Sequence, residues 1–211
     1  GSGPWSDLGS GAATLSATGS WETDQVGVSI YRGGVAITSP SSGDRLSAST
    51  TIASGSSLSL AITVGARSDN SSTWSSVRML LMAWNGNTTT RNLLAILTSG
   101  AAVYASSGIA GSIAQTGNVA VDWSRPHRLV VTHNQSTGAV VLYMDGVQVG
   151  TATDSGSRAA LNEITVGGIV GNGYSVSTAL AALGDAMVLT SAWTASQVLT
   201  DYYAARSAMG R

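Results

Sequence analysis

The sequence predicts an all-β fold, an antiparallel jelly-roll sandwich closed by one short C-terminal helix. Three observations predict it. Short apolar or alternating segments recur about every ten residues, which is typical of sandwiches and jelly rolls. Gly, Ser, Asn and Pro separate these segments and mark turns. Helical spacing of apolar residues is credible only near the C-terminus, and 211 residues suit one large all-β domain.

The expected strands of the first half begin with residues 26–31 and 35–38, which lie on either side of Arg32-Gly33-Gly34. Residues 58–64 alternate apolar with small polar residues, a period of two that predicts a half-buried strand. Residues 78–84 are mostly apolar and end at Asn85-Gly86-Asn87, a strong turn signal. Residues 93–97 and 101–105 are expected to form a hairpin.

The clearest strand signals lie between residues 128 and 151. Residues 129–133 and 140–144 read as two strands joined by the polar turn at 134–138. Asp145-Gly146 then predicts a type I′ hairpin turn, because both central residues of that turn need a positive φ. Residues 147–149 form the returning strand. Residues 163–168 and 186–189 read as core strands.

The C-terminal helix is predicted from its cap. Thr194 and Gln197 have the spacing of a capping box, in which each side chain binds the backbone N–H of the other residue. Val198, Leu199, Tyr202 and Tyr203 follow near helical spacing, and Gly210 stands at the end.

The segment from Trp123 to Arg206 resembles the laminin-G-like jelly-roll family, within the concanavalin A-like sandwich class. The matching stretches are Trp123 with His127–Thr132, Leu142–Val149, Ile164–Gly168, Leu183–Val188, and Thr194–Leu199 with Tyr202. Residues 7–9, 58–64 and 79–84 match only loosely. The resemblance implies a jelly-roll domain over residues 12–211, with His127 packed near Trp123. It does not imply one function, because this fold hosts many. Residues 1–11, with Pro4 and Trp5, are predicted separately as an N-terminal arm that docks on a neighbour, and a frayed end is the alternative.

Composition excludes several function classes. The chain has no Cys, no Phe and no Lys, and only 10% of its residues are charged, for a net charge of −1. Disulfides, thiolate metal sites, Cys nucleophiles and Lys Schiff bases are therefore excluded. Neither nucleic acid nor a membrane is an expected partner, because the chain lacks the basic charge that attracts them. Residues 1–5 show no signal-peptide pattern.

No catalytic residue is predicted. Glu22 and Asp24 have the i, i+2 spacing of glycanase carboxylates, but residues 25–28 supply no further carboxylate, so a solvated strand end is the better interpretation. His127 and His133 share one strand face but lack a third zinc ligand, so no metal site is predicted. A structural Ca²⁺ on Asp69, Asn70 or Asp154 is the one cofactor left open.

The predicted ligand-binding residues combine aromatic rings with amides and a carboxylate in polar segments: Asp69, Asn70, Trp74, Trp84, Asn85, Asn87 and Tyr174. Sugars stack their C–H faces on such rings, and the polar groups bind their hydroxyls. Since the chain has no Phe, Trp and Tyr are also needed in the core.

The sequence favours a non-enzymatic structural or interaction module. The nearly uncharged composition suits packing against other subunits, whose interfaces are depleted of charge. We therefore expect a phage or virus virion component, such as a capsid decoration or tail-fibre protein, with other virion subunits or further copies of itself as partners. The alternative is a secreted, extracellular, lectin-like module that binds glycans. A glycan hydrolase or lyase ranks third.

Overall fold

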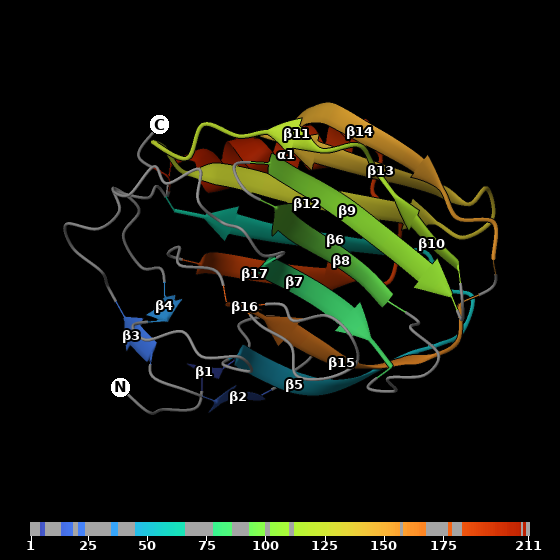
Figure 1. The fold of residues 1–211 in the computed structure, drawn as a ribbon, viewed down its shortest axis with the longest axis horizontal. Coiled ribbons are helices and arrows are strands. Elements are labelled where there is room, and N and C mark those ends of the chain that lie inside the picture. Colours follow the sequence, from blue (N-terminus) through green and yellow to red (C-terminus); the bar gives the residue numbers. More distant parts are fainter. Residues whose placement is uncertain are drawn as a thin grey trace.

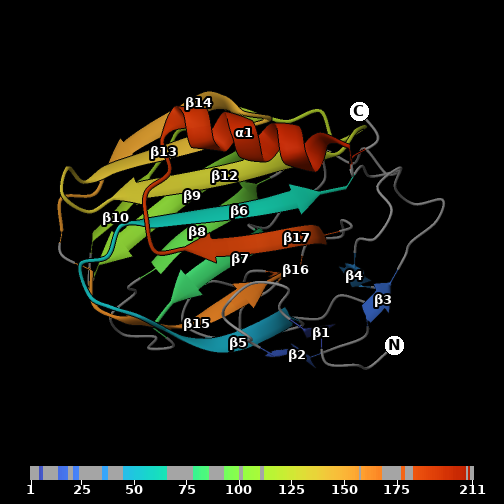
Figure 2. The same ribbon diagram turned by 180° about the vertical axis from the view of Figure 1, so that it is seen from behind.

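The computed structural model describes residues 5–6, 14–18, 21–23, 35–37, 45–65, 78–85, 93–99, 102–109, 112–156, 158–167, 177–178, 183–207 and 209. Two layers of β-sheet face each other, and helix α1 (Ala195–Arg206) lies against the smaller sheet (Figures 1 and 2). This arrangement confirms the predicted all-β sandwich with one C-terminal helix. None of the helices in these ranges is long and apolar enough to span a membrane.

The larger sheet has ten strands within the described residues. Its path is β1 (Trp5–Ser6), β2 (Thr14–Thr18), β5 (Arg45–Ile52), β15 (Leu161–Val166), β7 (Arg78–Trp84), β8 (Leu93–Ser99), β9 (Ala102–Ile109) and β10 (Ser112–Gln115). In addition, β11 (Val119–Ala120) pairs with β9, and β16 (Ser177–Thr178) pairs with β7 in parallel.

The smaller sheet has seven strands in the same described ranges. Its order is β14 (Val147–Thr153), β13 (Ala139–Met144), β12 (His127–Asn134), β6 (Leu58–Val64), β17 (Leu183–Leu189), β4 (Val35–Ile37) and β3 (Trp21–Thr23). At the predicted hairpin turn, Asp145 and Gly146 have φ angles of 54° and 81°, so both adopt the left-handed conformation. The expected strand at 26–31 lies outside the described residues.

The main core fills the space between the two sheets. Alternate residues of each strand point into it, as the period of two requires. Its fully buried members include Leu58, Leu60, Ile62, Leu80, Leu94, Ile96, Leu129, Val131 and Leu142. Each such side chain contributes roughly 2 kcal/mol through removal of its apolar surface from water.

Strand β6 is buried on both faces, so the prediction of a half-buried strand was wrong. Its second face is covered by the helix and by the segment that leads into it. Ala61 packs with Val130, Tyr143 and Val198 of α1. The Ser59 hydroxyl donates to the Ser191 carbonyl and accepts from the backbone N–H of Trp193, each at 2.8 Å. The small residues that looked solvent-facing therefore make room for the helix.

Helix α1 begins at the predicted capping box. The Thr194 hydroxyl accepts from the backbone N–H of Gln197 at 3.3 Å, and the Gln197 side chain accepts from the backbone N–H of Thr194 at 2.9 Å. Both bonds satisfy donors that a helix start would otherwise leave unpaired. The cap thus fixes where the helix begins on the smaller sheet.

Candidate functional site

The structure describes two of the seven predicted ligand-binding residues, Trp84 and Asn85. Trp84 is the last residue of β7, and Asn85 follows it, half-buried, at the end of the strand. The other predicted residues, Asp69, Asn70, Trp74, Asn87 and Tyr174, lie outside the described residues. Trp84 and Asn85 are therefore close to each other only because they are consecutive in the chain.

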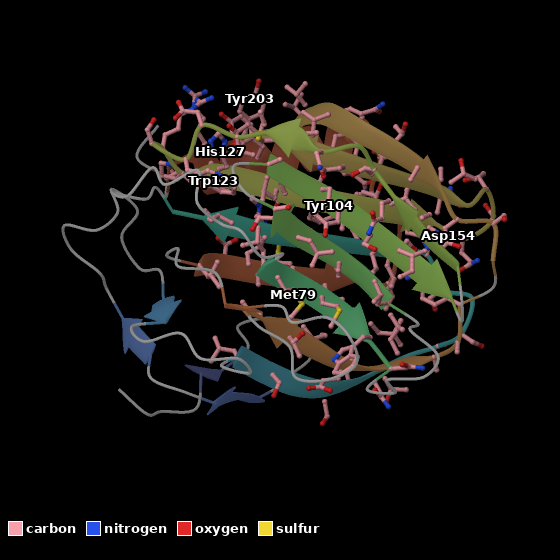
Figure 3. The ribbon with its side chains drawn as sticks, viewed as in Figure 1. Met79, Tyr104, Trp123, His127, Asp154 and Tyr203 are labelled. Carbon is pink, nitrogen blue, oxygen red and sulfur yellow. The ribbon has the colours of Figure 1, made fainter. Side chains whose placement is uncertain are left out.

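Trp84 belongs to an apolar cluster on the face of the larger sheet that is turned away from the smaller sheet. Its partners come from alternate positions of β7, β8 and β9: Met79, Met82, Leu93, Ala95, Leu97 and Tyr104. Figure 3 shows Met79 and Tyr104 on this outer face. The Trp84 side chain is only 8% exposed. Its ring supplies bulk to this cluster, whereas sugar stacking needs an open ring face.

His127 lies in the core-facing row of β12, at the end where the chain enters that strand. Its ring meets the Trp123 ring edge-on, with centroids 6.2 Å apart, which confirms the packing that the family resemblance implies. Its Nδ1 is 3.0 Å from the Asp145 carboxylate and its Nε2 is 2.8 Å from the Asp122 carbonyl. Both ring nitrogens thus face acceptors, so this histidine is part of a structural network.

Arg128 points from β12 to the opposite side of the smaller sheet, where it ties helix α1 to the strands. Its Nε and Nη2 donate to the two carboxylate oxygens of Asp201 in α1, at 2.8 and 3.0 Å. Its Nη1 donates to the Asp185 carboxylate at 2.9 Å and to the Thr63 hydroxyl at 3.1 Å. The guanidinium is fully buried, so the helix is held by a bidentate ion pair shielded from water.

His133 lies at the far end of β12 in a second buried polar group, on the side of the molecule where Figure 3 places Asp154. The Arg158 guanidinium donates from Nη2 to His133 Nδ1 and, at 3.3 Å, to the Ser107 hydroxyl. The Ser107 hydroxyl in turn donates to the Asp154 carboxylate at 2.5 Å. Because arginine has no acceptor, His133 must be neutral there, with its proton on Nε2.

Burial and this arginine both act on the titration of His133. Burial is the larger cause and Arg158 the second, and together they lower the pKa of His133 to about 4, while Asp154 opposes the change. Burial likewise lowers the pKa of Arg158 to about 10. Ser107, His133 and Asp154 are all buried, and the serine hydroxyl is bound directly to the carboxylate, so they do not form a nucleophile–base–acid relay.

The remaining sequence candidates for metal or acid–base chemistry are only partly within the described residues. Among the described residues, no three His, Asp or Glu side chains are grouped so that they could hold a metal ion. Asp154 accepts from Ser107 and from the backbone N–H of Gly156. Glu22 is in β3, opposite Ala36 of β4, and Asp24, Asp69 and Asn70 lie outside the described ranges. The structural Ca²⁺ stays a prediction.

One part of the surface carries exposed large apolar side chains. In the described part of the chain, the large apolar side chains that reach solvent are Val147 (63% exposed), Leu199 (38%) and Tyr203 (58%). All three lie where α1 meets the β13–β14 turn. Tyr202 joins them, half-buried, with its ring centroid 5.7 Å from that of Tyr203. We call Val147, Leu199, Tyr202 and Tyr203 the α1 patch; Figure 3 shows Tyr203 at the rim of the molecule.

The α1 patch rests on a rigid base. A Cβ added to Gly146 would lie 2.8 Å from a Leu199 methyl carbon and 3.3 Å from the Tyr202 ring, so the helix packs directly on the turn. The sequence predicted Tyr202 and Tyr203 only as helix residues. Leu199 and Tyr203 are four residues apart, so in a helix they lie on one side, which faces away from Val198. This spacing is the sequence signal that would have indicated an exposed apolar patch.

No protein-family model matches the chain, and no curated protein matches it in sequence. The fold, in contrast, is shared with solved structures. The binding domain of botulinum neurotoxin serotype G superposes with a TM-score of 0.67 at 10% identity, over 96% of this chain and 49% of that one. The chain therefore spans about half the length of that domain.

Two further structures resemble the chain. The CBM40 of the Ruminococcus gnavus IT-sialidase, bound to α2,3-sialyllactose, gives a TM-score of 0.53 at 11% identity, over 70% of this chain and 83% of that one. The other is a botulinum neurotoxin type C structure, described as showing that cell entry depends on two ganglioside molecules. It gives a TM-score of 0.62 at 10% identity, over 94% of this chain and 48% of that one. At these identities the likeness establishes the shared jelly-roll sandwich, the fold that the sequence predicted.

Proposed function

We propose that this chain is a non-enzymatic module that binds glycans. The observation that carries the proposal is the α1 patch, an open tyrosine ring and two exposed aliphatic side chains on a rigid base. Sugar rings bind proteins by placing their C–H faces on such aromatic surfaces. The resemblance to domains described with sialyllactose and with gangliosides supports the same ligand class.

Binding fits the described residues better than catalysis does. The two histidines are engaged in buried structural networks. The Asp145 carboxylate pairs with His127, those of Asp185 and Asp201 pair with Arg128, and that of Asp154 accepts from the Ser107 hydroxyl. None of the solved structures described above is a virion protein, and no contact in the described residues favours that role. The glycan-binding alternative is therefore the one that the observations support.

The test begins with the whole chain on a glycan array, followed by calorimetry on the best ligand. We expect Tyr203→Ala to weaken binding about tenfold, because the stacking face is removed. The fold should persist, since alanine favours a helix. Ala204→Ser, at an exposed position that follows Tyr203 in the chain and therefore faces another side of α1, is the matched control and should bind like wild type.

Two outcomes would count against the proposal in different ways. Failure of every glycan to bind would overturn the function itself. Unchanged binding by Tyr203→Ala, together with loss in Asn85→Ala or Asn87→Ala, would place the ligand at the end of β7 instead, where the sequence predicted it.

A further inference from the structure

Arg206 extends the α1 patch with a positive charge. It is exposed in the last turn of α1, three residues after Tyr203 and four after Tyr202, so it lies on the same flank of the helix. Its guanidinium makes no ion pair or hydrogen bond with the other residues that the structure describes. An open, planar donor group thus stands beside an open aromatic ring.

The nearby carboxylates of the smaller sheet and of α1 are already occupied. Asp201 is held by Arg128 through both of its oxygens and is 11% exposed. Asp145 accepts from His127 Nδ1 and from the backbone N–H of Arg128, each at 3.0 Å. Both carboxylates are therefore bound by partners within the fold. Within the described part of the chain, this flank therefore presents Arg206 as an exposed cation without an anionic partner.

We infer that the α1 patch with Arg206 recognises an acidic, N-acylated sugar at the end of a glycan. This inference rests on the proposed glycan-binding function and names the class of sugar. Arginine binds carboxylates with two parallel hydrogen bonds, a geometry that a neutral sugar does not offer. The Tyr203 ring suits the C–H face of the same sugar, and Leu199 and Val147 suit the methyl group of an N-acetyl substituent.

Each part of the patch thus has a separate task. Tyr203 holds any sugar of the right shape, whereas Arg206 selects those that carry a carboxylate. Because the carboxylate contact is ionic and lies at the surface, added salt should weaken it, and salt should hardly affect stacking. Arg206 is therefore a specificity-determining residue, which can be separated experimentally from the ring that supplies general affinity.

The experiment measures binding of two sugars to the whole chain by calorimetry. One is α2,3-sialyllactose, and the other is lactose, the disaccharide that remains when the acidic sugar is absent. Wild type should bind sialyllactose at least about tenfold more tightly, and Arg206→Gln should remove most of that preference. Arg206→Lys should retain part of it. Arg125→Gln removes an equally positive, exposed group outside the patch and should keep the wild-type preference.

The results separate this inference from the function on which it rests. Equal binding of the two sugars by wild type, or an unchanged preference in Arg206→Gln, would overturn the acidic-sugar inference while leaving a glycan-binding module. Binding of neither sugar would overturn it as well, and the glycan array would then decide the proposed function. In 1 M salt the screening length is roughly 3 Å, so a preference for sialyllactose that persists unchanged there also contradicts the inference.

Discussion

The buried contact between His133 and Arg158 predicts how stability responds to acid. The unfolded chain has an ordinary histidine with a pKa near 6.5, whereas in the folded protein the pKa of His133 is about 4. Between these two values the unfolded state binds a proton that the native state does not. Stability therefore falls as the pH drops from 6.5 to 4, and this contribution levels off at lower pH.

The size of the effect follows from the same two pKa values. Each pH unit between them is worth about 1.4 kcal/mol, so His133 should cost the fold about 3 kcal/mol over this window. The variant His133→Gln keeps an oxygen that can accept from Arg158 but cannot titrate. Its free energy of unfolding, compared with that of wild type, isolates the contribution of His133 from the carboxylates that titrate in both proteins.

Urea unfolding at several pH values between 7 and 4 measures this difference. Wild type should lose about 3 kcal/mol relative to His133→Gln as the pH falls. With only two histidines in the chain, NMR can also follow each ring directly. Parallel pH profiles for wild type and His133→Gln, or an NMR midpoint for His133 near 6.5, would refute the reasoning.

Two further predictions concern the base of the α1 patch. Asp201→Asn should lower the free energy of unfolding by about 2–3 kcal/mol in urea titrations, because Arg128 loses its buried partner. Asp185→Asn should cost less than about 1 kcal/mol, because the Asp185 side chain is 53% exposed. Equal losses in the two variants would contradict this ranking. Gly146→Ala should cost about 2 kcal/mol, since φ is +81° and the new methyl group would meet α1 at 2.8 Å. Gly55→Ala, at φ +71° in open space, should cost only the backbone part, about 1 kcal/mol, and equal losses in the two alanine variants would contradict a steric contact between residue 146 and α1.

The parts of the fold that the sequence predicted well are those with local signals. Residues 58–64 and 78–84 coincide with β6 and β7, and the Asp145-Gly146 turn and the Thr194 cap have the predicted conformations. In each case neighbouring residues carry the information, through alternation, a turn pair or a capping box. Strand β5 (Arg45–Ile52) was missed because its sequence, RLSASTTI, has few apolar residues and reads as a polar loop.

The site was harder to predict, because it depends on what packs against what. Trp84 stands in a polar segment of the sequence, yet it is buried with side chains from two neighbouring strands. Val147 and Leu199 are more than fifty residues apart and meet only because α1 packs on Gly146. Likewise, Arg128 gives no sign in the sequence that Asp185 and Asp201 will converge on it. Long-range pairing of this kind leaves no periodic signal in one chain.

The strand order also sets how the chain can be assembled. In the larger sheet, β15 lies between β5 and β7, so Leu161 stands opposite Ile52, and in the smaller sheet β17 pairs with β6, with Val188 opposite Leu60. Two stretches of the described chain form local meanders, β7 to β10 in the larger sheet and β12 to β14 in the smaller one. Since closing loops of more than a hundred residues costs entropy before any contact is gained, this topology favours slow folding that starts from the two meanders. It also means that no cut through the middle of the chain leaves two halves with complete sheets.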